Sequence, residues 1–358
     1  MNKKNWFFGG FLLLVVFSIR LFSAYPILIE QYYSTGIYPY ISLFFRSLTG
    51  WTFISMGDIV YGLTGAWLIW KGIRAIKAIH ATRFTRPYVA KKTLITLQRM
   101  LLIYIIFNLC WGLNYNRVGI AEQLDLKMDK YTTQELKSVN EVLLQKINAC
   151  KTAIAKDSGT VLKSDEIFKR SIAAYSEAEK KYPFLYYQQP SVKSALWGWL
   201  GNYIGFNGYY NPFTGEAQVN TTIPKFLQPF TTCHEIAHQL GYAKENEANF
   251  VGYLSATASK DSFWLYSTYL DMFLYADRNL YAVDSTEAKL LANQLLPAVK
   301  ADLRYLRAFN LSHMNAVEPI IKWVYGKYLQ SNQQPNGVLT YDQVTAFLIA
   351  YHKKFGDL

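Results

Sequence analysis

The sequence predicts a mainly α-helical protein of the α+β class: an N-terminal membrane region of three helices, then a helix-rich domain with a small β-sheet. Three observations predict this class. The first 113 residues contain three long apolar segments. The remainder carries a series of helix-capping signals. Strand and turn residues are concentrated in one stretch, 207–222. Residues 114–358 have the length of one domain.

Each apolar segment is close to the length of about 20 residues that spans a bilayer. The segments run over about 6–24, 51–70 and 94–113. Between the second and third, residues 71–93 contain seven lysines and arginines and no acid, and Lys3 and Lys4 precede the first segment. Basic residues favour the cytoplasmic side. We therefore expect an integral plasma (inner) membrane protein with a cytoplasmic N-terminus and a cytoplasmic loop at 71–93. Residues 114–358 would then be extracytoplasmic, in the periplasm or outside the cell.

Two alternatives stay open for these segments. The first segment can be a signal peptide cleaved after residues 22–24, although Arg20 just before that site disfavours cleavage. All three can be buried helices of a soluble protein, which the tryptophans near the ends of the second and third segments disfavour.

The net charge of +12 belongs almost entirely to the apolar third of the chain. Residues 1–113 carry 12 basic residues against two acidic ones, and residues 114–358 carry 25 against 23. The basic residues thus indicate membrane orientation, with the lipid bilayer as a partner. A nucleic-acid-binding domain is not expected.

The most informative motif is His-Glu-Ile-Ala-His at 234–238. On a helix, His234 and His238 project from one face and can share one metal ion. We expect one Zn²⁺, bound by neutral imidazoles at about 2.0–2.1 Å and by a third protein ligand, with water in the fourth position. Glu235 would take the proton of that water. The alternative is an exposed amphipathic helix that happens to carry two histidines.

The flanking residues fit a helix of this kind. Pro229 suits its first turn, and Gly241 suits the left-handed position that ends it after Leu240. A sharp turn there would bring back a second helix, beginning near Lys244, against the first.

In this second helix the chain resembles the gluzincin metallopeptidases, whose third ligand is the first Glu of a Glu-x-x-Ala-Asp pattern. Residues 245–249 read Glu-Asn-Glu-Ala-Asn. The resemblance implies Glu245 as the third ligand and Asn249 in place of the Asp that supports a ligand by a hydrogen bond. Glu247 is the alternative ligand. Both glutamates can instead form a solvated first turn favoured by the helix dipole.

The order of residues 194–206, GYYNPFTGEAQVN, HEIAHQLG and ENEANF resembles an uncharacterised bacterial family of membrane-anchored zincin-like proteins. The resemblance covers most of the chain. It implies a membrane topology and a metal site, but no substrate.

The remaining patterns predict mostly helices. Thr132 and Glu135 form a capping box for a helix to about residue 155, and further helices are expected from 164 to before 183, from 261 to about 280, over 284–310 with a kink at Pro297, and over 315–330 and 340–355. The alternating residues Ala217, Gln218, Val219 and Asn220 predict a strand. We interpret it as a substrate-binding edge strand, with an ordinary hairpin as the alternative. A Cys150–Cys233 disulfide is allowed but not required.

These patterns together predict a membrane-anchored zinc metallopeptidase. Its substrates would be envelope proteins or peptides near the membrane. His313 and the tyrosines of 266–281 are candidates to stabilise the transition state. Two alternatives remain: a zinc-binding sensor or scaffold without catalysis, and a zinc amidase that acts on cell-wall amides. The sequence does not indicate the oligomeric state.

Overall fold

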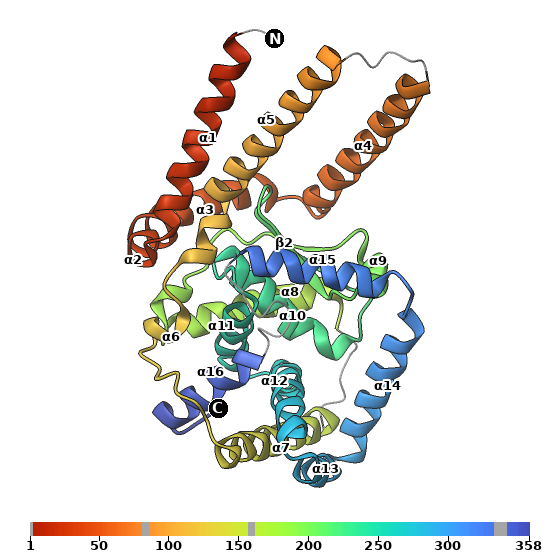
Figure 1. Cartoon of the computed structure of the whole chain (residues 1–358). Helices are drawn as coiled ribbons and strands as arrows, with labels where there is room; N and C mark the ends of the chain where they lie inside the picture. The colour runs from red at the N-terminus through yellow and green to blue at the C-terminus, as the bar shows by residue number, and fades with distance from the viewer. Residues whose placement is uncertain (1–2, 81–85, 157–161, 333–341) are drawn as a thin grey trace.

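The computed structural model describes residues 3–80, 86–156, 162–332 and 342–358. It consists of a helical domain with three long helices, α1, α4 and α5, rising from one side (Figure 1). Helices form most of the described chain and one small sheet completes it, so the predicted fold class is confirmed.

The N-terminal region contains two helices that are long and apolar enough to cross a membrane, by length and composition, at Lys4–Ser23 and Tyr88–Cys110. They lie in α1 and α5, which pack along each other. The elements of this region are α1 (Lys3–Ser23), α2 (Pro26–Leu28), the π-helical segment η1 (Ile29–Ile37), α3 (Tyr38–Thr49), α4 (Met56–His80) and α5 (Arg86–Cys110).

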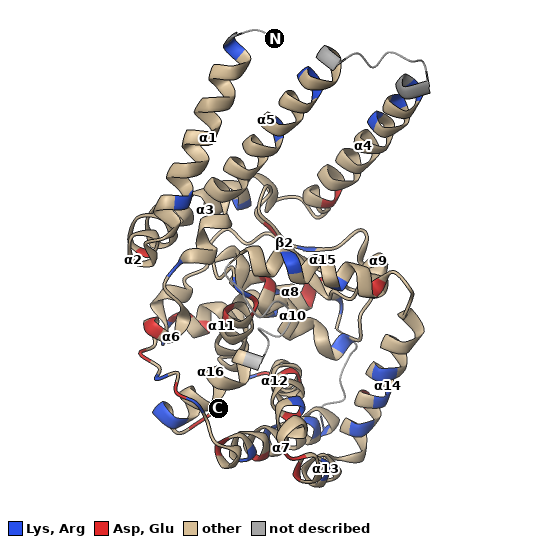
Figure 2. Ribbon diagram, in the orientation of Figure 1, with Lys and Arg blue, Asp and Glu red and all other residues tan. Residues whose placement is uncertain are grey.

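The cytoplasmic loop predicted over residues 71–93 is largely helical, and its location stays a prediction. Residues 71–80 continue α4 and residues 86–93 begin α5, and only 81–85 lie outside the described residues. Lysine and arginine are good helix formers, so a basic stretch extends a helix where no breaker follows. The predicted span at 51–70 is also displaced, because α4 begins at Met56; its crossing of a membrane stays a prediction. Figure 2 shows lysines and arginines at the ends of α1, α4 and α5 far from the domain.

Two charged residues of the N-terminal region contact the domain. Arg46 is buried, and its guanidinium donates to the carbonyl of Gln188. Asp58 is buried at the start of α4 and accepts hydrogen bonds from the backbone N–H of Leu196, at 2.7 Å, and from the hydroxyl of Tyr209. Paired in this way, a buried charge avoids most of its desolvation cost, and each pair attaches the projecting helices to the domain.

The helices of the domain begin mostly where the capping signals predict. The capping box is confirmed: the N–H of Glu135 donates to the hydroxyl of Thr132 at 3.2 Å, and the Glu135 carboxylate accepts from the N–H of Thr132 at 2.7 Å. Asp261 caps its helix by accepting from the N–H of Phe263. Three helices of this part are α7 (Thr133–Lys156), α8 (Ser164–Glu179) and α12 (Ser262–Val283), and two helices near the C-terminus are α15 (Glu318–Ser331) and α16 (Asp342–Phe355).

The single kinked helix predicted over 284–310 is wrong, because the structure has two helices there. They are α13 (Ser285–Asn293) and α14 (Pro297–His313). Pro297 disfavours helical backbone at the residue before it, and Leu296 accordingly has φ −58° and ψ 148°. The proline therefore begins a new helix instead of bending an existing one.

The sheet has three short strands, β1 (Val192–Ser194), β2 (Gly208–Asn211) and β3 (Glu216–Val219), in the order β1-β3-β2. β3 pairs in parallel with β1 and antiparallel with β2. The prediction that residues 217–220 form an edge strand is therefore wrong: β3 is the central strand, and Asn220 lies just beyond its end. An alternating pattern indicates a strand but not its neighbours, which depend on the distant β1.

Helix α10 (Gln228–Gln239) lies in the middle of the domain, packed against α8, α11 (Glu245–Thr257), α12 and the sheet. Nearly all of its residues are buried. Cys233 on this helix and Cys150 on α7 are both free, so the allowed disulfide is not formed. The core thus surrounds the helix that carries the His-Glu-Ile-Ala-His motif.

A tight turn ends α10 and starts α11, as the position of Gly241 predicts. Gly241 has φ +87°. Its N–H donates to the carbonyl of His238, and the N–H of Tyr242 donates to that of Ala237, which together make a Schellman motif. A Cβ atom on Gly241 would lie 2.8 Å from a ring carbon of Tyr38. The turn therefore requires glycine both for its backbone and for its contact with the N-terminal region.

We expect Gly241→Ala to lower the melting temperature of the full-length protein in detergent. Strain at a left-handed residue costs roughly 1–3 kcal/mol, and the contact with Tyr38 adds to it. Gly356→Ala is the matched control, since Gly356 has φ +75° but no atom within 4 Å of an added Cβ. Equal losses in the two variants would contradict the role of the Tyr38 contact.

Candidate metal centre

Helix α10 brings three potential metal ligands together. His234, Glu235 and His238 each offer a ligand atom, and these atoms lie within 4.8 Å of one another. The two imidazole rings have centroids 4.7 Å apart and are nearly perpendicular. The spacing of four residues on a helix produces this arrangement, as the sequence predicts.

Glu245, the first residue of α11, completes the group. Its Oε2 lies 3.3 Å from Nε2 of His234 and 3.8 Å from Nε2 of His238. Two ligands at about 2.0–2.1 Å from a tetrahedral zinc ion lie about 3.3 Å apart. The three side chains therefore fit a zinc ion with little movement. The tight turn at Gly241 is what places Glu245 here.

Hydrogen bonds orient two of these ligands. Nδ1 of His238 lies 2.7 Å from the carbonyl of Tyr242, which leaves Nε2 for a metal ion. The hydroxyl of Tyr325, on α15, donates to Oε1 of Glu245 at 2.7 Å, which leaves Oε2 facing the histidines. Neither Tyr242 nor Tyr325 belongs to a recognisable sequence pattern. Tyr325 in particular comes from a helix 80 residues further along the chain.

The charges of the cluster depend on its burial. Burial works against a charge on His234, but its hydrogen bond to Glu245 and the nearby carboxylates raise its pKa. Burial also opposes the charge of Glu245, but the hydrogen bond from His234, the charge of His234 and the hydrogen bond from Tyr325 lower its pKa. Burial lowers the pKa of His238 to about 4, which keeps this imidazole neutral at pH 7. Zinc binds neutral imidazole and ionised carboxylate, so only the His234 proton has to leave.

Glu235 lies close to strand β2. Its side chain is buried, and Oε2 has no hydrogen-bond partner in the described part of the chain. A Cβ atom on Gly208 of β2 would lie 2.6 Å from Oε1 of Glu235, so glycine is required for this close approach. Burial raises the pKa of Glu235 to about 8, although the charge of His234 opposes the rise. Such a carboxylate can accept and hold a proton near neutral pH.

The structure separates the two glutamates that the sequence left as alternative ligands. Glu247 accepts from the ammonium of Lys244 at 3.2 Å. Its carboxylate faces Gly119 and does not lie with the histidines. A Cβ atom on Gly119 would be 2.7 Å from Oε1 of Glu247. Glu245, in contrast, lies beside both imidazoles.

Two other predicted site residues have different outcomes. Asn249 is buried and lines the cavity that adjoins the cluster, but its Nδ2 makes no hydrogen bond within the described residues. His313 is not brought to the cluster. Its ring packs on Phe309 and Tyr203, with centroids 4.5 and 4.9 Å away, and it is not among the residues that line the cavity. The predicted role of His313 therefore has no support in the geometry.

The cluster opens into a cavity of about 1480 Å³. Tyr275, one of the tyrosines of 266–281, lines it together with Asp271 and Arg278 of α12. Burial raises the pKa of Asp271 to about 7, against the opposing charge of His234. The same cavity is lined by Trp111 and by residues of β2. No single segment of sequence indicates this combination, because the lining residues come from parts of the chain between Asp58 and Tyr328 that are far apart in the sequence.

We expect Glu245→Gln to weaken zinc binding by the full-length protein by more than the ~10–100-fold typical of residues that only support a ligand. An amide cannot supply the charge or the basic oxygen of the carboxylate. Glu247→Gln, two residues away, should retain the affinity of the natural chain. Metal analysis and competition with a chelator measure both. The reverse order of affinities would make Glu247 the ligand, and full zinc retention by His234→Ala or His238→Ala would refute the site.

Comparison with known proteins gives one family. No curated protein and no solved structure matches the chain. A family model described as "Protein of unknown function (DUF3810)" matches residues 33–349, which include the cluster and most of the N-terminal region. The chain therefore belongs to the DUF3810 family.

Proposed function

We propose that this protein is a membrane-anchored zinc metallopeptidase. The observation that carries the proposal is the position of Glu245 Oε2, at 3.3 and 3.8 Å from the two imidazole nitrogens, with the buried Glu235 beside them. The resemblance of residues 234–249 to the gluzincins supports the same assignment. A purely structural zinc site needs no such carboxylate next to its ligands.

The residues around the cluster suit the hydrolysis of an amide bond. Zinc held by His234, His238 and Glu245 would supply a Lewis acid and a water of lowered pKa. Glu235 takes the proton of the attacking water and passes it to the nitrogen of the leaving amine as the C–N bond breaks. The products are a carboxylic acid and an amine. Arg278, in the wall of the cavity, is the candidate to stabilise the negative charge that develops on the carbonyl oxygen.

Strand β2 favours a peptide as the substrate. It is an outer strand of the sheet, and residues 207–210 line the cavity next to Glu235. An extended peptide can pair with the outer edge of such a strand through backbone hydrogen bonds. The role that the sequence suggested for residues 217–220 thus belongs to their neighbour β2.

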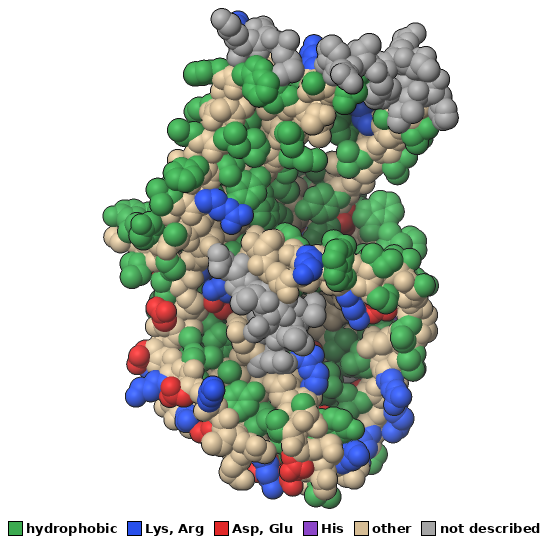
Figure 3. All heavy atoms as spheres, in the orientation of Figure 1, with side chains coloured by type: hydrophobic (Ala, Val, Ile, Leu, Met, Phe, Trp, Pro, Cys, Tyr) green, Lys and Arg blue, Asp and Glu red, His purple; other side chains and the backbone are tan. Residues whose placement is uncertain are grey.

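We also propose that the domain lies outside the cytoplasm. Helices α1, α4 and α5 rise from the same side of the domain (Figure 1), and basic residues gather at their far ends (Figure 2). Figure 3 shows hydrophobic side chains over these helices and charged side chains mainly over the opposite end of the molecule. Three crossings with the basic ends in the cytoplasm satisfy the positive-inside rule.

We expect Glu235→Gln to lower the rate of peptide hydrolysis by about 10²–10⁴-fold, the usual contribution of a general base. The zinc content should stay stoichiometric, because Glu235 is not needed as a ligand. A library of peptides with mass-spectrometric detection measures the hydrolysis. Glu141→Gln, a change on an exposed carboxylate of α7, is the control and should behave as the natural chain.

Equally poor cleavage by the natural chain and by Glu235→Gln, with zinc bound to both, would contradict the peptidase and favour a sensor or scaffold. Cleavage of cell-wall amides without cleavage of peptides would favour the amidase.

The topology has its own test. Alkaline phosphatase fused after Asp357 should be active in cells, because this enzyme needs an oxidising compartment for its disulfides. A fluorescent protein that matures only in the cytoplasm should be dark at the same position. The opposite pair of results would refute three crossings with an outside C-terminus.

A further inference from the structure

The cavity at the metal cluster reaches the projecting helices. Its wall includes Asp58, Tyr61 and Gly62 of α4 and Phe107 of α5, together with His234 and Glu235. A substrate can therefore approach Glu235 from the side on which α4 and α5 leave the domain. The sides of the cavity show what kind of substrate can do so.

The side next to α4 is aromatic. The rings of Tyr61 and Tyr209 stack with centroids 6.1 Å apart. Tyr209 is followed along the wall by Gly208, which faces Glu235. Both carboxylate oxygens of Asp58 already accept hydrogen bonds, from Leu196 and Tyr209. The one acid on this side is thus paired within the wall.

The side next to α5 is aromatic as well. Phe107 meets Trp111 edge to face, with centroids 6.0 Å apart, and Trp111 meets His238 in the same way at 6.0 Å. The indole N–H of Trp111 donates to the carbonyl of His238 at 3.2 Å, so its polar atom faces the helix. Two aromatic sides therefore run from α4 and α5 to the cluster.

Polar side chains from other elements also line the cavity. They are Arg278 on α12, Asn310 on α14 and Lys322 on α15. The cavity thus combines aromatic sides at α4 and α5 with polar groups from α12, α14 and α15. A molecule with an apolar end and a peptide end matches this distribution.

The cavity extends between the two helices, because Tyr61 and Gly62 of α4 and Phe107 of α5 all line it. α1 packs along α5, but α4 has no comparable interface with either of them in the described residues. Figure 1 shows α4 standing apart from α5 above the domain. A transmembrane helix is about 10–12 Å across with its side chains, and so needs a wider opening between the aromatic sides than a single acyl chain does. A flexible hydrocarbon chain is thinner and can follow them.

We propose that the substrate is a peptide with a covalently attached acyl chain, such as a lipoprotein or lipopeptide. The acyl chain lies between the domain ends of α4 and α5, and the peptide extends along β2 to Glu235. This inference rests on the proposed function, because it names the substrate class of the same site.

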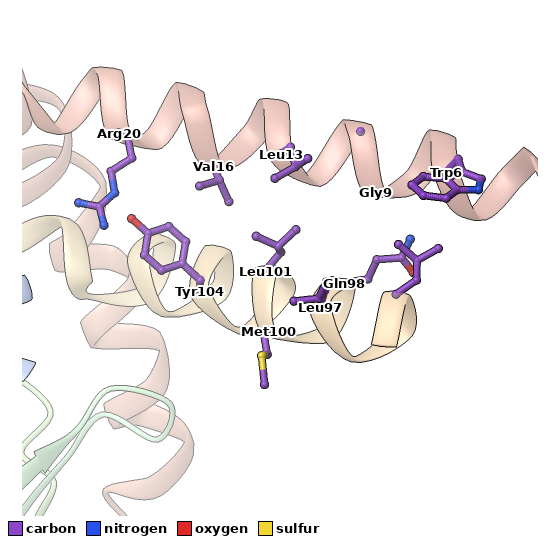
Figure 4. Close-up of a pocket in the computed structure, with 12 residues that line it drawn as sticks. Trp6, Gly9, Leu13, Val16, Arg20, Leu97, Gln98, Met100, Leu101 and Tyr104 are labelled. Carbon is purple, nitrogen blue, oxygen red and sulfur yellow. The ribbon is translucent and has the colours of Figure 1, made fainter. Parts of the chain in front are cut away.

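A second pocket supplies an internal comparison. It has a volume of about 640 Å³, lies between α1 and α5, and is lined by apolar residues such as Leu13 and Leu101, with Arg20 and Tyr104 at one end (Figure 4). None of its lining residues belongs to the metal cluster. Lipid of the bilayer would fill this pocket whatever the substrate is, so acyl chains found there do not bear on catalysis.

Photocrosslinking tests the proposal on the full-length, zinc-loaded Glu235→Gln variant in phosphatidylcholine nanodiscs. The probe is a pentapeptide with an N-terminal hexadecanoyl chain that ends in a diazirine. We expect crosslinks in residues 59–66 and 103–111, abolished by an excess of the same lipopeptide without diazirine. A second probe attaches the same pentapeptide to an apolar transmembrane helix instead of the acyl chain, with the diazirine at the same depth in the bilayer. We expect this helical probe to give no crosslinks in these two segments that an excess of unlabelled competitor abolishes.

The substitution Gly62→Leu tests whether the acyl chain lies beside α4. A Cβ atom on Gly62 would have Trp197 at an ordinary distance of 3.7 Å, so the larger side chain projects into the cavity without breaking the fold. In Gly62→Leu we expect the loss of most of the crosslinks that an excess of unlabelled lipopeptide abolishes in the parent variant. Gly72→Leu is the control: it makes the same change on α4, with no atom within 4 Å of its Cβ and no place in the cavity wall. It should crosslink as the parent does.

Labelling confined to the α1–α5 pocket or to the outer faces of the helices would overturn the proposal. Crosslinks in these segments from the helical probe alone, abolished by its competitor, would also overturn the proposal. An unchanged crosslinking pattern in Gly62→Leu would do the same. The crosslinking map of the parent variant tests the proposal even if Gly62→Leu does not fold. Crosslinking requires no hydrolysis, so the two proposals fail separately. Crosslinks in the expected segments without any peptidase activity would refute only the proposed function. Peptide cleavage with crosslinks elsewhere would refute only the substrate class.

Discussion

The buried carbonyl groups at the C-terminal end of α10 are the constraint on which the rest of the structure depends. The last carbonyls of a helix have no partner inside it, and a buried carbonyl without a partner costs free energy. Besides the N–H groups of Gly241 and Tyr242 in the turn, donors here come from the N-terminal region. Tyr38 and Ser42 of α3 donate to Gln239 at 3.0 and 2.8 Å, and Trp111 donates to His238 at 3.2 Å. The helix that carries the candidate metal ligands is therefore held by α3 and by the residue that follows α5.

The N-terminal region also contacts the turn that follows α10. Arg117 donates to the carbonyl of Gly241 at 3.2 Å and pairs with Glu30 at 2.6 Å. Tyr38 lies so close to Gly241 that no side chain fits between them. Because this turn places Glu245 beside the histidines, residues of the N-terminal region hold this candidate ligand in position. The cluster belongs to the whole chain and not to the C-terminal domain alone.

The sequence predicted those parts of the site that depend on neighbouring residues. The helix of His234 and His238, its end at Gly241 and the start of the next helix near Lys244 all follow from short-range geometry and are confirmed. Other predictions were wrong where distant residues decide. β3 is central because β1 pairs with its other edge, and His313 packs on aromatic rings away from the cavity. Tyr325 was missed, since nothing near it in the sequence indicates that it bonds Glu245.

The sequence by itself determined the residues of the candidate metal site, the apolar character of the N-terminal region and most helix ends. All of these depend on residue type and on spacings of a few residues along one helix or turn. Only the tertiary structure decided which glutamate lies beside the histidines, that β2 is the strand beside Glu235, and that α4 and α5 line the cavity. These depend on contacts between segments far apart along the chain, such as Glu245 with Tyr325, 80 residues on, and Asp58 with Tyr209, 151 residues on. Such pairs leave no periodic pattern, because their packing is fixed only when the whole chain folds.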